Sequence, residues 1–215
     1  MTNTESHDFS TVLADEELRA LSKHGLLKTL PRNVIVMSEG DQTDSLYIIV
    51  SGKVKVFVAD ADGKEVVLGV QGAGEYFGEM VLDEGPRSAS VMTLERSRFV
   101  VVPKSEVKQF LAQHPGFALH LVRKLIRRVR TLTENVRSLA LMDVYGRVAR
   151  LLLELAVEQD GRLVIAEKLT QQDIASRVGA SREMISRILK DLVAGGYVSI
   201  ERKHITLHRQ LPPRW

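Results

Sequence analysis

Two arginines and one glutamate share a face of a predicted helix near the carboxyl end of the chain. Arg182, Glu183 and Arg187 lie in SREMISRILKDLVAGG (181–196), whose apolar residues recur at helical spacing. Arginine can donate two hydrogen bonds to guanine, and glutamate can accept one from cytosine. The pattern therefore predicts a helix that reads G·C pairs in the DNA major groove. An ordinary solvated face, with Glu183 and Arg187 as an i,i+4 ion pair, is the alternative.

A second short helix and a turn must position this face. Thr170 and Asp173 form a capping-box pattern at the start of TQQDIASRVG, and Gly179 can adopt the positive φ that turns the chain. Ser181 is then the expected cap of the next helix. The inward stripe of that helix is expected to be Met184, Ile185, Ile188, Leu189 and Leu192. The pattern predicts a helix-turn-helix, followed by a pair of strands.

The DNA-binding side chains are expected to come from both helices. The set is Thr170, Gln171, Ser181, Arg182, Glu183, Ser186, Arg187 and Lys190. The formal charge supports this placement, because residues 1–118 hold 12 Lys and Arg against 17 Asp and Glu, whereas residues 137–215 hold 13 against 9. An acidic front half joined to a basic back half is expected if only the back half meets double-stranded DNA.

The composition excludes several classes of protein. The chain has no cysteine, which removes disulfides, thiolate zinc sites and iron–sulfur clusters. It contains no apolar stretch long enough to span a membrane, and residues 1–10 lack the features of a signal peptide. We therefore expect a cytoplasmic protein that has no membrane partner.

The front half is a series of short β-branched runs separated by turn residues. The runs are NVIVM (33–37), SLYIIV (45–50), VKVFVA (54–59), EVVLGV (65–70), SASVMT (88–93) and FVVV (99–102). Asp62-Gly63 is typical of a tight hairpin. Short strands with such close turns predict an antiparallel barrel or jelly roll.

The pattern becomes helical after Pro103. One helix is expected before Pro115, and a long helix from about Phe117 to Met142 carries an apolar heptad seam. The seam is Leu119, Val122, Ile126, Val129, Thr133, Val136 and Ala140, and the basic residues Arg123, Lys124, Arg127, Arg128 and Arg130 lie on the outer faces. A coiled-coil homodimer is the favoured interpretation, and a helix packed along its own domain is the alternative.

A further helix is expected after the long one. It covers Asp143–Val157, so that a hinge falls near Asp143, and the strand LVIA (163–166) follows it. Together with the barrel, these elements predict an α+β fold.

A second group of residues that could bind a ligand lies in FGEMVLDEGPRSAS (77–90). Gly78 permits a close backbone approach, and Glu79 can accept from a sugar hydroxyl. Arg87 and the backbone N–H groups of Ser88 and Ala89 could hold a phosphate. From composition alone, a surface arginine in a glycine-proline loop is the simpler interpretation.

The whole chain resembles the cyclic-AMP receptor protein/FNR family of bacterial transcription regulators. The resemblance rests on the order of barrel, long helix and winged helix-turn-helix, and above all on TQQDIASRVGASREMISRILKDL (170–192). It implies a cyclic-nucleotide-binding jelly roll over residues 1–116, a dimerisation helix over 117–142 and a DNA-binding domain over 143–215. It also implies base contacts from Arg182, Glu183 and Arg187 to a palindromic TGTGA-like site, and RNA polymerase as a partner.

The resemblance extends to the ligand segment, which is similar to the family's phosphate-binding cassette. It implies Glu79 on the ribose 2′-hydroxyl and Arg87 and Ser88 on the cyclic phosphate. The complete implied set is Gly78, Glu79, Met80, Arg87, Ser88, Ala89 and Thr133. Thr133 is the polar residue of the apolar seam, where the family places a contact to the base from the opposite subunit; a threonine bonded to its own helix is the alternative.

The effector expected from this resemblance is cyclic AMP. Two departures from the cyclic-AMP-binding pattern keep other effectors open: Leu132 replaces a frequent threonine, and the loop between Glu79 and Arg87 is slightly shorter. Cyclic GMP, cyclic di-GMP or ligand-independent DNA binding are the alternatives.

An enzyme of the cupin kind is the remaining hypothesis, and it requires clustered metal ligands. The six histidines are His7, His24, His114, His120, His204 and His208, and none lies in a predicted barrel strand. We therefore expect no enzyme activity and no metal, haem or iron–sulfur cluster.

Overall fold

The structure is a computed structural model that describes residues 13, 15–42, 44–83, 85–159 and 161–212. Within these residues the chain divides into two compact units. Unit 1 falls within Met1–Val58 and Leu68–Arg128, and unit 2 within Ala59–Val67 and Val129–Trp215. None of the helices in the described part of the chain is both long and apolar enough to cross a membrane.

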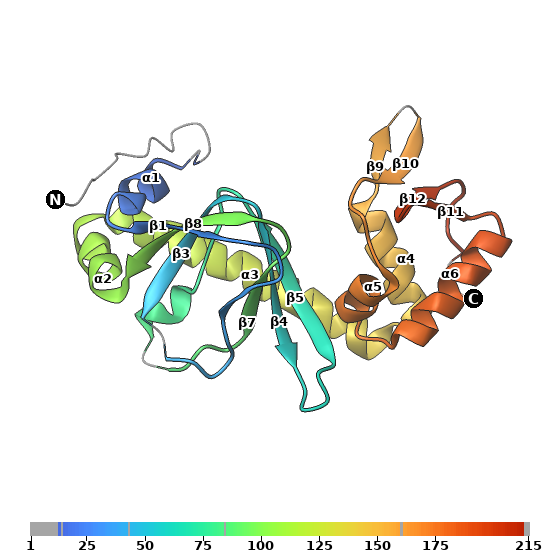
Figure 1. The fold of residues 1–215 in the computed structure, drawn as a ribbon, viewed down its shortest axis with the longest axis horizontal. Helices are drawn as coiled ribbons and strands as arrows, with labels where there is room; N and C mark the ends of the chain where they lie inside the picture. Colours follow the sequence, from blue (N-terminus) through green and yellow to red (C-terminus); the bar gives the residue numbers. More distant parts are fainter. Residues whose placement is uncertain (1–12, 14, 43, 84, 160, 213–215) are drawn as a thin grey trace. The chain divides into compact units, whose positions relative to one another are not determined.

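The first part of the chain forms two four-stranded sheets, one ordered β1-β8-β3-β6 and the other β2-β7-β4-β5 (Figure 1). The strands are β1 Leu26–Leu30, β2 Ile35–Met37, β3 Ser45–Ser51, β4 Lys53–Ala59, β5 Glu65–Gly72, β6 Tyr76–Phe77, β7 Ser90–Thr93 and β8 Ser97–Pro103. The pairs β1–β8, β3–β8, β3–β6, β2–β7 and β4–β7 are antiparallel. This confirms the predicted jelly roll, and the predicted hairpin at Gly63 adopts a φ of 78°.

The interior of the jelly roll is filled from both sheets. Phe77 stacks on Tyr47 with ring centroids 5.1 Å apart and meets the edge of Phe99 at 5.7 Å. Met37, Val56 and other buried side chains complete this cluster. A second cluster packs the helices α1 Glu16–Ser22, α2 Lys104–Gln113 and the first part of α3 Pro115–Leu141 against β3 and β8. Helix α1 and strands β1 and β6 were not predicted from the sequence.

The described part of unit 2 contains the last part of α3, three further helices and a four-stranded sheet ordered β11-β12-β10-β9. The elements are α4 Val144–Leu155, β9 Val157–Gln159, β10 Arg162–Ile165, α5 Gln171–Val178, α6 Arg182–Ala194, β11 Val198–Glu201 and β12 His204–Leu207. The helix predicted to reach Val157 ends at Leu155, and Val157 instead begins β9, which was not predicted. The overall α+β prediction, with a long helix and a winged helix-turn-helix, is confirmed.

Candidate functional site

The start of α5 is fixed by side-chain caps. The Thr170 hydroxyl accepts from the backbone N–H of Asp173 at 3.1 Å, and the Asp173 carboxylate accepts from the backbone N–H of Thr170 at 2.8 Å. Gly179 ends the helix at a φ of 66°, and the Ser181 hydroxyl accepts from the N–H of Met184 at 3.2 Å to begin α6. The predicted capping box, turn and cap are confirmed.

Helix α6 presents one buried and one exposed face. Ile185, Leu189 and Leu192 are buried in the core of unit 2, and Ile188 packs against it. Met184 was predicted to belong to this stripe, but 38% of it is exposed. At about 100° per residue, Met184 lies a quarter of a turn or more from the centre of the buried stripe, which explains its position on the flank.

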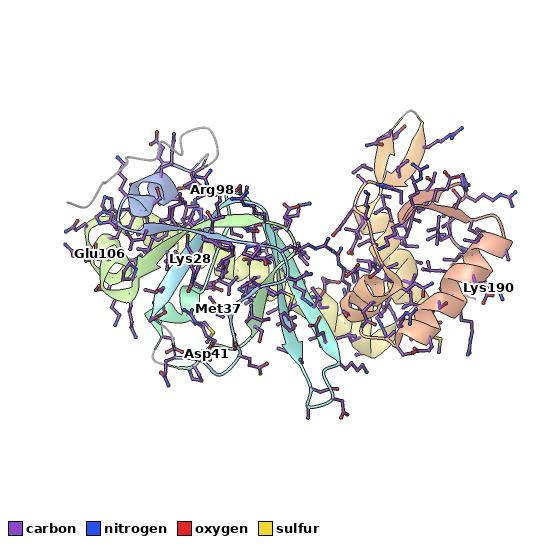
Figure 2. All side chains as sticks on the ribbon, viewed as in Figure 1. Lys28, Met37, Asp41, Arg98, Glu106 and Lys190 are labelled. Carbon is purple, nitrogen blue, oxygen red and sulfur yellow. The ribbon has the colours of Figure 1, made fainter. Side chains whose placement is uncertain are left out.

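The predicted DNA-reading side chains lie on the exposed face of α6. Arg182, Glu183 and Arg187 are exposed, and Ser186 is half-buried. Lys190 is also exposed (Figure 2). Glu183 and Arg187 form no ion pair within 4.0 Å among the described residues, so this structure does not contain the i,i+4 pair of the alternative interpretation.

Arg147 of α4 holds the end of α5 in place. Its Nε donates to the carbonyl of Val178 at 2.8 Å, and its Nη1 donates to the carbonyl of Met142 at 2.8 Å. A Cβ at Gly179 would lie 3.1 Å from Leu139, so the turn also approaches the last part of α3 closely. These contacts position the helix-turn-helix on its own unit.

The predicted ligand segment forms a compact group inside the jelly roll, which we call the barrel cradle (Gly78, Glu79, Arg87, Ser88 and Ala89). Arg87 is 4% exposed and donates to the carbonyls of Gly78 at 2.9 Å and Ser45 at 2.7 Å. Burial lowers the pKa of its guanidinium, and neighbouring groups, including Asp44, oppose that shift. The surface-loop interpretation of Arg87 is therefore wrong.

Gly78 allows this close approach. Its φ is 84°, and a Cβ there would lie 2.9 Å from Nη1 of Arg87 and 3.0 Å from the carbonyl oxygen of Ser45. Ala89 is buried and Ser88 is exposed, and within the described part of the chain their backbone N–H groups have no hydrogen-bond partner. Unpaired N–H groups beside a buried guanidinium make a suitable site for an anion.

Glu79 already has a cationic partner. Its side chain is 12% exposed and accepts from Nη1 of Arg128 at 2.6 Å. Arg128 and Met80 also line the cavity of the cradle, whose volume is about 30 Å³. Ligand pockets usually have volumes of about 300 Å³ or more, so this cavity is smaller than a usual ligand pocket.

Two side chains of α3, Lys124 and Arg128, were predicted to lie on the outer faces of a coiled coil, and this prediction is wrong. Arg128 instead meets Glu79, and Lys124 lies over the ring of Tyr76, with Nζ 3.3 Å from the ring centroid. Lys124 also donates to the backbone carbonyl of Tyr76, and burial lowers the pKa of its ammonium group to about 8. The spacing of four residues places both on one helix face, but it does not tell whether that face meets solvent or the jelly roll.

Thr133 is exposed, and its hydroxyl donates to the carbonyl of Val129 at 2.9 Å. This local bond is the one that the alternative interpretation expected. His7 lies outside the described residues. In the part of the chain that is described, no group of three or more His, Asp or Glu side chains could hold a metal ion.

Comparison with known proteins agrees with both regions. The model of the cyclic nucleotide-binding domain matches residues 27–114, and that of the Crp-like helix-turn-helix domain matches residues 146–210. A CRP-like cAMP-activated global transcriptional regulator from Mycobacterium tuberculosis (strain ATCC 25618 / H37Rv) is 37% identical over 195 residues, covering 88% of this chain and 87% of the relative. The cAMP-activated global transcriptional regulator CRP of Pasteurella multocida (strain Pm70) is 32% identical, with coverages of 93% and 98%.

A solved structure leads to the same conclusion. The c-di-GMP responsive global regulator CLP of Xanthomonas campestris is 27% identical, with a TM-score of 0.81 over 90% of this chain and 98% of that one. The relatives are transcription regulators rather than enzymes. The chain therefore belongs to the CRP/FNR family of transcription regulators, with a cyclic nucleotide-binding domain and a Crp-like helix-turn-helix domain.

Proposed function

We propose that the chain is a homodimeric regulator that binds a palindromic TGTGA-like site when cyclic AMP occupies the barrel cradle. The observation that carries the DNA half is the exposed face of α6, where Arg182, Glu183 and Arg187 follow a capped turn. An N-terminal group of two arginines and a glutamate on such a helix suits guanine and cytosine edges in the major groove. Thr170, Gln171, Ser181, Ser186 and Lys190 supply further contacts.

The cradle supports the ligand half. Arg87 and the N–H groups of Ser88 and Ala89 would hold the cyclic phosphate, and Glu79 would accept from the ribose hydroxyl. Two curated relatives are named as cAMP-activated, whereas the structural neighbour CLP is named as c-di-GMP responsive. Cyclic di-GMP is therefore the second candidate, and cyclic GMP the third.

The contact between Glu79 and Arg128 suggests how the ligand acts. A ribose hydroxyl at Glu79 would replace Arg128, whose side chain belongs to α3. The ligand would thereby change the contacts of the long helix, which continues through Thr133 and ends beside the cap of α4 at Asp143. Binding would shift the population between two states of the dimer.

The exposed apolar seam of α3 is the observation that favours the proposed homodimer. Leu119, Val122, Ile126, Val129 and Val136 are between 48% and 65% exposed in the single chain. Apolar residues in steps of three and four that stay uncovered on a long helix are the pattern of a coiled-coil interface. A two-fold dimer would place two copies of α6 on the two half-sites of a palindrome, and RNA polymerase would be a partner on DNA.

Calorimetric titration of the full chain with cyclic AMP, cyclic GMP and cyclic di-GMP tests the effector. We expect saturable binding of cyclic AMP at one site per chain, and much weaker binding of the other two. The variant Arg87→Gln should lose this binding, whereas Arg98→Gln, an exposed arginine of β8, should retain it. Absence of binding by all three nucleotides would rule out cyclic-nucleotide control by this cradle.

A further inference from the structure

Helix α6 has an exposed apolar side chain in its first turn. Met184 is 38% exposed and lies outside the buried core of unit 2, whereas Ile188, one turn later, packs against that core. Among the residues of α6, all of which the structure describes, Val193 in the last turn is the other exposed large apolar side chain. A single exposed apolar residue is common on protein surfaces, so the place of Met184 on the helix decides whether it has a role.

The N-terminal cap of α6 fixes the position of Met184. The backbone N–H of Met184 donates to the Ser181 hydroxyl at 3.2 Å, which places Met184 in the first turn of the helix that Arg182 begins. Side chains on an α-helix lean toward its N-terminus. A recognition helix enters the major groove with its N-terminal residues, so the Met184 side chain belongs to the end of α6 that would approach the bases.

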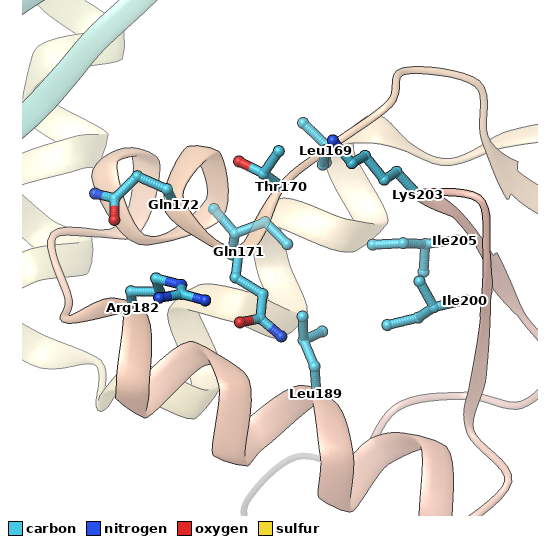
Figure 3. Close-up of a pocket in the computed structure, with 10 residues that line it drawn as sticks. Leu169, Thr170, Gln171, Gln172, Arg182, Leu189, Ile200, Lys203 and Ile205 are labelled. Atoms are coloured by element: carbon cyan, nitrogen blue, oxygen red, sulfur yellow. The ribbon is translucent and has the colours of Figure 1, made fainter.

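Met184 lies on the flank of α6 that faces away from α5. Arg182 and Gln171 line the same groove between α5 and α6, which places Arg182 on the flank next to α5 (Figure 3). At about 100° per residue, Met184 lies about 200° around the helix axis from Arg182. Arg187 comes one turn after Met184 and is its neighbour on the helix surface. Met184 therefore borders the exposed DNA-reading side chains on the side opposite to α5.

The chemistry of a thioether restricts what Met184 can recognise. The side chain donates no hydrogen bond and its sulfur is only a weak acceptor, so it does not suit a phosphate or a guanine edge. In the major groove, the C5 methyl group of thymine is the apolar group that a side chain can contact. Arg182, Glu183 and Arg187 suit guanine and cytosine, whereas a TGTGA half-site also contains A·T pairs. An apolar reader of thymine would complement these residues.

We propose that Met184 is a specificity-determining residue that packs its thioether side chain against the C5 methyl group of a thymine in the half-site. The unbranched side chain can follow the surface of the groove without needing a hydrogen-bond partner. This role of Met184 rests on the proposed function, because it requires that α6 bind the TGTGA palindrome.

Replacement of thymine by deoxyuridine tests this contact, because it removes the methyl group and leaves every hydrogen-bonding group of the base in place. Fluorescence anisotropy of the full chain with saturating cyclic AMP compares the TGTGA palindrome with palindromes in which each thymine is replaced in turn, in both half-sites. We expect one of these replacements to weaken binding by the wild type about 15-fold, because a buried methyl group contributes a factor of about four in each half-site.

Variants of α6 show whether Met184 makes the contact. Met184→Ala should weaken binding to the thymine palindrome and should bind the sensitive uracil palindrome equally well. Met184→Leu keeps an apolar side chain and should keep the preference for thymine. Val193→Ala is the matched control, because Val193 is 44% exposed on the same helix, and it should retain the full preference. Thermal unfolding shows whether each variant is folded.

Two results would overturn this role of Met184 alone. One is an equal preference for thymine over uracil in the wild type and Met184→Ala, and the other is a wild-type affinity that no uracil replacement changes. Failure of the wild type to bind the thymine palindrome at all would overturn the proposed function, and the role of Met184 with it.

Discussion

The barrel cradle and the exposed face of α6 hold their arginines in opposite ways. Arg87 is 4% exposed and donates to two backbone carbonyls, and Glu79 beside it is paired with Arg128. Arg182 and Arg187 are exposed at the start of a capped helix. Under the proposed function, the face of α6 would meet DNA without rearrangement, whereas the cradle would exchange internal partners for a ligand. That exchange would allow the ligand to change the state of the protein.

Because the arginines of α6 are exposed, the largest effect on binding is expected from a substitution on the exposed face of α6. Arg187→Gln should weaken binding to a TGTGA palindrome about 5- to 100-fold, because a bidentate contact to guanine contributes about 1–3 kcal/mol of discrimination. Fluorescence anisotropy with the palindrome and with a scrambled duplex measures both affinities. Arg162→Gln removes an equal charge from the exposed strand β10 and should affect the two duplexes alike. Equal losses from both variants on the palindrome would show that Arg187 does not read bases.

The stability of the cradle should instead be sensitive to an added side-chain atom. Gly78→Ala places a Cβ 2.9 Å from Arg87 in a backbone of positive φ, whereas Gly63→Ala has a similar φ and no atom within 4 Å. We expect Gly78→Ala to reduce the free energy of unfolding by about 1–3 kcal/mol more than Gly63→Ala, because only Gly78→Ala overpacks the interior. Urea denaturation of both variants measures the difference. Indistinguishable losses would contradict a tightly packed cradle.

The last effect is expected from Lys124, beside the cradle, and it appears in the pH dependence of stability. Its pKa falls from 10.5 to about 8 on folding, because burial disfavours the ammonium group. Between these two values the unfolded chain binds more protons than the folded chain, so this lysine makes stability rise with pH from about 8 to 10. Lys124→Met should remove that rise, and Lys108→Met, at an exposed position of α2, should retain it. Chemical denaturation across this pH range measures both slopes, and parallel slopes for all three proteins would contradict the burial of Lys124.

Much of the fold could be predicted from local signals. The β-branched runs, Asp62-Gly63 and the caps at Thr170 and Ser181 each specify a local structure, and all are present. The missed elements are short and depend on distant partners. The run LLKTL of β1 has no alternating pattern, and it forms a strand because it pairs with β8. The two residues of β6 pair with β3, and the three residues of β9 pair with β10.

In the candidate site, too, the contacts that depend on distant partners could not be predicted from the sequence. The types of Glu79, Arg87 and Arg182 suggested their chemistry, because each is the residue that a sugar hydroxyl, a phosphate or a guanine requires. Arg128 was not predicted, because a cation that faces solvent and one that faces a neighbouring barrel have the same spacing on a helix. Its contact with Glu79 follows from tertiary packing, as does the small volume of the cavity in the cradle.

The central claim is that the exposed face of α6 is preformed and that ligand binding in the barrel cradle controls its affinity for DNA. Fluorescence anisotropy with a labelled TGTGA palindrome tests it most directly, by comparing the wild type and Arg87→Gln with and without saturating cyclic AMP. We predict that cyclic AMP raises the DNA affinity of the wild type at least about tenfold, a coupling of roughly 1.4 kcal/mol, and leaves that of Arg87→Gln unchanged. Equal DNA affinity of the wild type with and without cyclic AMP would contradict the account.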